Sequence, residues 1–110
     1  MSSMRIAVPV LQGRLSHDVG DCEAFAFLDV DSNTRGVTAE SLLVAPPMQH
    51  GELPSWLAQM GATLVIASEL SAGTRDLCQY HGIAVLVGAP RLSPGELVSA
   101  YLNGGLHRSS

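Results

Sequence analysis

The sequence contains no lysine, and its six basic residues are all arginines set against ten acidic residues. The formal net charge is −4, and no run of basic residues occurs. Proteins that bind nucleic acid usually present a basic face to the phosphates. We therefore predict that nucleic acid is not a partner of this protein.

Long apolar runs and paired cysteines are also missing. No apolar stretch approaches the roughly 18 residues of a membrane span, so no membrane partner is expected. The two cysteines, Cys22 and Cys78, lie far apart, and no secretory signal is recognisable. We expect a cytoplasmic protein with reduced thiols. A lone cysteine is more often a small core residue than a reactive group, which is our preferred interpretation of Cys78.

The common catalytic motifs are absent: there is no Gly-x-Gly-x-x-Gly, no phosphate loop with its lysine and no His-Glu-x-x-His. Cys22 could form a nucleophile–base pair with His17 or His50. No third group that would orient such a base can be identified. We therefore predict that the protein is not an enzyme and has no catalytic residues.

The composition is that of one packed domain. The chain has 110 residues, of which 46% are hydrophobic and only 5% aromatic. We expect a single domain over residues 1–110, with a mainly aliphatic core.

Hydrophobic patterns predict an α/β fold. Short apolar runs bounded by turn formers predict strands, and apolar residues three and four apart predict helices. We expect strands over 5–10, 25–30, 37–44, 63–67 and 83–87, and helices over 53–60, 72–80 and 94–103. Residues 11–24 are expected to form a turn and a loop. The order β-β-β-α-β-α-β-α predicts a mixed five-stranded sheet with helices on its faces, because strand–helix–strand crossovers make parallel pairs.

The loop after the first strand is the first candidate site. Ser16, His17, Asp18 and Cys22 place a hydroxyl, an imidazole, a carboxylate and a thiol within a few residues. One interpretation is a polar surface loop with Cys22 tucked beneath it. The other is a ligand loop in which His17 and Cys22 bind a metal or a metal cluster.

Two predicted helix starts are the other candidates. His50 and Gly51 precede the first helix, where His50 could cap the helix or act as a metal ligand. Ser71, Gly73 and Arg75 follow a buried strand, where backbone N–H groups and a guanidinium could bind an anion. The alternative in each case is an ordinary capped helix start. We predict His17, Cys22 and His50 as metal ligands.

Several fragments, in this order, resemble the dinitrogenase iron-molybdenum cofactor biosynthesis family. They cover most of the chain: Met4-Arg5-Ile6-Ala7-Val8-Pro9-Val10, the loop from Leu15 to Cys22, His50-Gly51, Gly61-Ala62-Thr63-Leu64-Val65-Ile66-Ala67, Gly82-Ile83-Ala84-Val85 and Ala100-Tyr101-Leu102-Asn103-Gly104-Gly105-Leu106.

The resemblance implies a ribonuclease-H-like three-layer α/β/α sandwich without ribonuclease activity. It also implies a non-enzymatic binder or carrier of an iron–molybdenum cofactor precursor or a related molybdenum–sulfur cluster. In the similar orange proteins the cluster also contains copper. The predicted partner is thus a metal–sulfur cluster or another small anionic ligand, and the predicted cofactor-binding residues are those of the three candidate sites above.

The chain departs from the family pattern in its ligand loops. Asp18-Val19-Gly20 stands where a histidine-phenylalanine-glycine triplet is common, and Met48 and Gln49 replace histidines that often precede His50. Ser68 and Glu69 occupy positions where glycines are common. The alternative function is therefore a small-molecule or protein-interaction module of the same fold without a cluster. An exposed sheet edge would also allow a homodimer.

Overall fold

The structure is a computed structural model that describes residues 3–17, 19, 22–31, 33–46 and 51–105. In that part of the chain the regular elements, in order, are β1 (Ser3–Leu11), β2 (Arg14–Leu15), β3 (Ala24–Asp31), β4 (Gly36–Leu43), α1 (Leu53–Gln59), β5 (Leu64–Ile66), α2 (Ala72–Tyr80), β6 (Ala84–Leu86) and α3 (Pro94–Leu102). Among the described residues, no helix has the length and apolar character needed to cross a membrane.

The strands form one mixed sheet in the order β4-β3-β1-β5-β6, with β2 paired to β1. β3 is antiparallel to both β1 and β4, as the hairpin prediction requires. β5 is parallel to β1 and to β6, as the strand–helix–strand order predicts. The predicted α/β class and mixed sheet therefore agree with the structure.

The predicted strand count of five is too low, because the described residues form six strands. The additional strand is β2, in a segment for which we expected a turn and a loop. Leu15 pairs with Val10 of β1, and its backbone N–H donates to the Leu92 carbonyl at 2.8 Å. A two-residue strand has no periodicity of its own, so only its neighbours reveal it.

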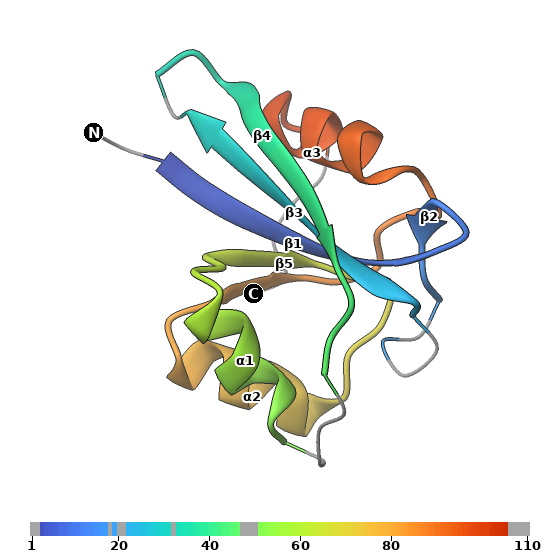
Figure 1. Ribbon diagram of the computed structural model, residues 1–110, viewed down its shortest axis with the longest axis vertical. Helices are drawn as coiled ribbons and strands as arrows, with labels where there is room; N and C mark the ends of the chain where they lie inside the picture. The colour runs from blue at the N-terminus through green and yellow to red at the C-terminus, as the bar shows by residue number, and fades with distance from the viewer. Residues whose placement is uncertain (1–2, 18, 20–21, 32, 47–50, 106–110) are drawn as a thin grey trace.

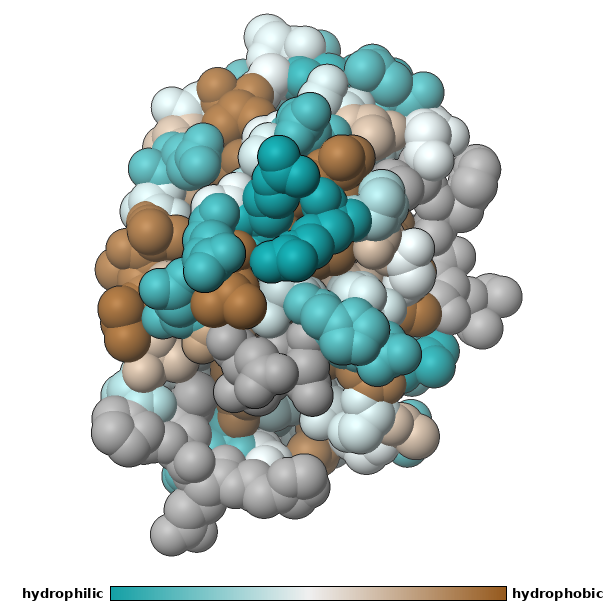
Figure 2. Space-filling model, turned by 90° about the vertical axis from the view of Figure 1, so that its right-hand side faces the viewer, coloured by the Kyte–Doolittle hydropathy of each residue, from teal (hydrophilic) through white to brown (hydrophobic). Residues whose placement is uncertain are grey.

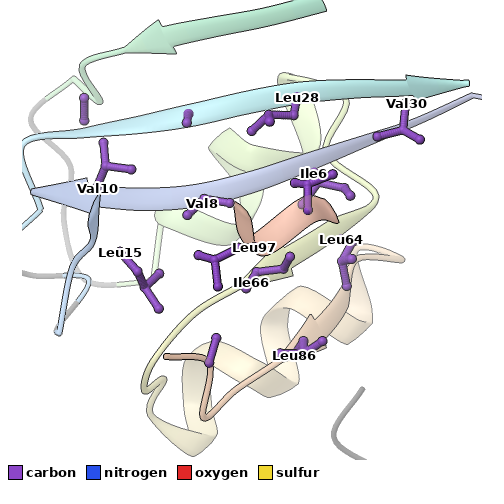
Figure 3. Close-up of a cluster of buried hydrophobic side chains, with 14 residues drawn as sticks. Ile6, Val8, Val10, Leu15, Leu28, Val30, Leu64, Ile66, Leu86 and Leu97 are labelled. Atoms are coloured by element: carbon purple, nitrogen blue, oxygen red, sulfur yellow. The ribbon is translucent and has the colours of Figure 1, made fainter. Parts of the chain in front are cut away.

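Helices cover both faces of the sheet, which gives three layers (Figure 1). α1 and α2 pack on one face, and α3 packs on the other. Successive residues of β1 point to opposite faces, so Ile6 and Val8 lie on the α3 side and Ala7 on the other. Figure 3 shows Leu97 of α3 among the side chains that β1 and β5 direct toward it.

The few aromatic side chains gather on the face covered by α1. Trp56 of α1 lies edge-on against Phe25 and Phe27 of β3, with ring centroids 5.7 and 5.8 Å apart. Edge-to-face contacts at such distances are favourable beyond the area they bury. They attach α1 to the antiparallel half of the sheet.

Candidate functional site

The candidate site is the edge of the sheet where the parallel strands end. β1, β5 and β6 run in one direction, so their carboxyl ends meet at this edge, where open α/β sheets usually bind ligands. α2 and α3 begin there because each follows a parallel strand. Figure 2 views the molecule from the side toward which β1 runs in Figure 1, and hydrophilic side chains gather across the middle of that face.

The loop after β2 holds the first group of predicted residues. The backbone N–H of Ser16 donates to the Pro9 carbonyl at 2.9 Å, and the Ser16 side chain is buried. Cys22 is half-buried, and its N–H donates to the Val19 carbonyl at 3.3 Å. His17 is exposed at the same edge. Asp18 lies outside the described residues.

The start of α2 holds the second group. Ser71 is the N-cap, and its Oγ accepts a hydrogen bond from the Thr74 N–H at 3.2 Å. Gly73 is exposed, and no heavy atom would lie within 4 Å of a Cβ added there. Arg75 is half-buried in the first turn. Ser71 therefore has the capping role that the sequence suggested, and the backbone around Gly73 is open to an approaching ligand.

These two groups lie on the same face of the sheet. Val19 and Cys22 of the loop pack against the same hydrophobic cluster as Leu70, which precedes the N-cap of α2. That cluster lies between the sheet and the two helices α1 and α2. The thiol of Cys22 and the start of α2 thus share one side of the edge. Sequence reasoning missed Val19 and Leu70 as residues that pack on this face, because isolated apolar residues in loops carry no periodic pattern.

The segment before α1 lies further along α2. A Cβ added at Gly51 would lie 3.9 Å from Cδ1 of Leu77, in the middle of α2. The N-cap of α1 is Glu52, whereas the sequence suggested His50 for that role. His50 itself lies outside the described residues. The predicted convergence of His50 with His17 and Cys22 therefore stays a prediction.

The described part of this edge contains few potential metal ligands. Within these residues, no group of three or more His, Cys, Asp and Glu side chains lies close enough to hold a metal ion. The half-buried Cys22, the exposed His17 and the start of α2 lie at the edge. Backbone N–H groups at a helix start favour negative charge.

Solved structures with the same fold include three close matches in shape. The protein PH0822 superposes with a TM-score of 0.84 at 23% identity, over 96% of this chain and 95% of that one. MJ0327 from Methanocaldococcus jannaschii has a TM-score of 0.78 at 15% identity, over 100% and 98%. The apo form of the orange protein from Desulfovibrio gigas has a TM-score of 0.76 at 22% identity, over 97% and 93%. At these identities the likeness establishes the fold alone.

Sequence comparison gives the family. A search of curated proteins found no match. The family model described as "Dinitrogenase iron-molybdenum cofactor" matches residues 2–104, which is nearly the whole chain and includes all nine predicted site residues. The chain therefore belongs to the dinitrogenase iron-molybdenum cofactor family.

Proposed function

We propose that this protein binds and carries an anionic metal–sulfur cluster without catalysing a reaction. The cluster would be an iron–molybdenum cofactor precursor or a related molybdenum–sulfur cluster, with copper as an optional component. The observation that supports the proposal is that Cys22 and Leu70, just before α2, pack on the same face of the sheet, in a chain of this family. We also propose that the three-layer fold is of the ribonuclease-H-like type.

Each part of the edge would contribute a different interaction. The N–H groups at the start of α2, a helix of nine residues, favour negative charge. The half-buried thiol of Cys22 could coordinate molybdenum, iron or copper once it loses its proton. The imidazole of His17 would be a further ligand. Because these interactions are few, we expect reversible binding, as suits a carrier.

The test is reconstitution with tetrathiomolybdate, alone and with copper or iron salts. After desalting, visible absorption and elemental analysis are read on the protein fraction. We expect a coloured, stoichiometric complex that the triple variant His17→Ala, Cys22→Ala, His50→Ala loses. His81→Ala is the matched control, because His81 follows the far end of α2 and should leave metal retention unchanged.

A second candidate function is a binding module of the same fold that holds no cluster. The exposed carboxylate of Glu69 favours it, because it lies in the turn before α2 and would repel an anionic cluster. If a folded wild-type protein retains no metal from any of these mixtures, the carrier proposal fails for those clusters. Metal retained equally by the triple variant would refute the assignment of the site.

A further inference from the structure

A hollow lies on the face of the sheet that α3 covers, beside the carboxyl end of β1. Its volume is about 520 Å³, and it lies between β3, β4, the turn after β1 and the first residue of α3. That volume is within the range of small-molecule sites. Most of the surface inside it is apolar, from Val10, Ala24, Ala26, Leu42 and Pro94.

Small residues on β3 create this hollow. Ala24 and Ala26 point to the α3 side, on which Leu28 and Val30 fill the space further along the same strand. Leu42 of β4 is the register partner of Ala26, so it lies on the same face, and 65% of it is exposed. Ala24 and Ala26, which are 5% and 1% exposed, thus form the bottom of the hollow beside the exposed Leu42. A ligand in the hollow would remove mainly the apolar surface of Leu42 from water.

The charged groups of the hollow all have one sign. Glu23 and Glu40 line it, and no arginine does so among the described residues. Oε1 of Glu23 accepts a hydrogen bond from the backbone N–H of Gln12 at 2.7 Å, which holds this carboxylate at the rim. Glu40 has no ion-pair partner in the described part of the chain. The rim would therefore attract a cation and repel an anion.

We propose that this hollow binds a small organic cation with an apolar body and a single ammonium or guanidinium group. The apolar body would lie on Ala24, Ala26 and Leu42, and the charged group would reach the carboxylates of Glu23 and Glu40. This site lies on the opposite face of the sheet from the proposed cluster site and borders it at Glu23, which follows Cys22 in the chain. The hollow lies on the α3 face, whereas Cys22 and Leu70 pack on the face of α1 and α2.

The test is a titration of the ¹⁵N-labelled protein at neutral pH, followed by backbone amide shifts. The probe is 2-phenylethylammonium, and the matched probe of opposite charge is 3-phenylpropanoate. We expect the cation alone to give saturable shifts, centred on the amides of Ala24, Ala26 and Leu42. Glu23→Gln and Glu40→Gln should each raise the dissociation constant about two- to fivefold, as expected for partly exposed charge pairs.

Glu69→Gln is the control, because Glu69 is an exposed acid outside the hollow and should not change the dissociation constant. Equal binding of both probes would overturn the proposal, since the carboxylates would then confer no selectivity. Shifts elsewhere, or none up to the solubility limit of the cation, would also overturn it. Loss of metal retention in the reconstitution experiment would leave this site unaffected.

Discussion

The two cysteines differ in their surroundings more than in their sequence context. Cys78 lies on the inner side of α2, where only 1% of it is exposed. Burial raises the pKa of the Cys78 thiol. Its thiolate fraction at any given pH is thus lowered, and a thiol in its neutral form is a poor nucleophile. Cys78 is a packing residue, as its sequence position suggested, whereas Cys22 at the site edge is half-buried.

We predict that a disulfide reagent such as dithionitrobenzoate modifies Cys22 well before Cys78 in the native protein at pH 8. Cys78 should react more than about a hundredfold more slowly, because its reaction requires local opening. The rate is followed by absorbance, and Cys22→Ala should remove the fast phase. Both thiols should react together in urea. Equal rates in the native protein would contradict the burial of Cys78.

At the scale of the element, α3 has the best-defined beginning of the helices described. The Ser93 Oγ accepts from the Glu96 N–H at 3.3 Å, and Oε1 of Glu96 accepts from the Ser93 N–H at 3.1 Å. Pro94 follows the cap, at a position where its missing N–H costs nothing. The sequence predicted this start correctly because the whole signature is local.

We predict that Ser93→Ala lowers the free energy of unfolding by about 1 kcal/mol, the usual cost of losing an N-cap. Urea denaturation followed by circular dichroism measures it. Ser99→Ala is the control, because Ser99 is exposed on the same helix and should change the free energy by less than about 0.5 kcal/mol. An equal effect of both substitutions would contradict the role of the cap.

The same cap predicts a dependence on pH. Hydrogen bonds from Ser93 lower the pKa of Glu96. The contribution of the ionised carboxylate is therefore present above the ordinary glutamate pKa of about 4.3 and is lost as pH falls through the lower pKa of the folded state. We expect the stability difference between wild type and Glu96→Gln to shrink from pH 7 to pH 3. A difference that is constant over this range would contradict the cap.

Elements with local signals were predictable, and those that depend on neighbours were not. The start of α2 was predictable because Ser71 and the residues after it contain the cap. β2 was not, because its two residues owe their conformation to β1 and to Leu92. Strand order predicted which edge the candidate residues share, since parallel strands end together, and their role as a site stays a prediction. The hollow was not foreseen, because it depends on Ala26 lying opposite Leu42 across two strands.

At the scale of the molecule, β4 is the outer strand of the antiparallel half of the sheet. Val37 and Leu42, two of its apolar side chains, are 45% and 65% exposed. The β3–β4 pairing has a register shift between Asp29 and Val30. Glu40 adds a charge to the apolar side chains of β4. Both features are typical of edge strands that avoid pairing with a second copy. The homodimer considered from the sequence stays a prediction, and these features make β4 a poor place for it.

We predict that Glu40→Val promotes self-association, because it removes the only charge of β4 and extends its apolar surface. Sedimentation velocity over a range of concentrations measures the change against wild type. Glu69→Val is the control, because Glu69 lies in a turn rather than on an edge strand. A wild-type protein that is already dimeric, with no change in Glu40→Val, would contradict the protective role of Glu40.

The site loop that follows β2 is attached to the sheet in a way that affects how its sequence can change in evolution. The site loop leaves the sheet at Ser16, whose N–H binds the Pro9 carbonyl at 2.9 Å, and returns at Glu23, whose N–H binds the Val10 carbonyl at 2.8 Å. Its two ends are therefore held by consecutive residues of β1. Closing a loop of twice the length costs only about 0.6 kcal/mol more. The loop can thus accept insertions or substitutions that change its ligand specificity. The strand pairing of the sheet would keep its register.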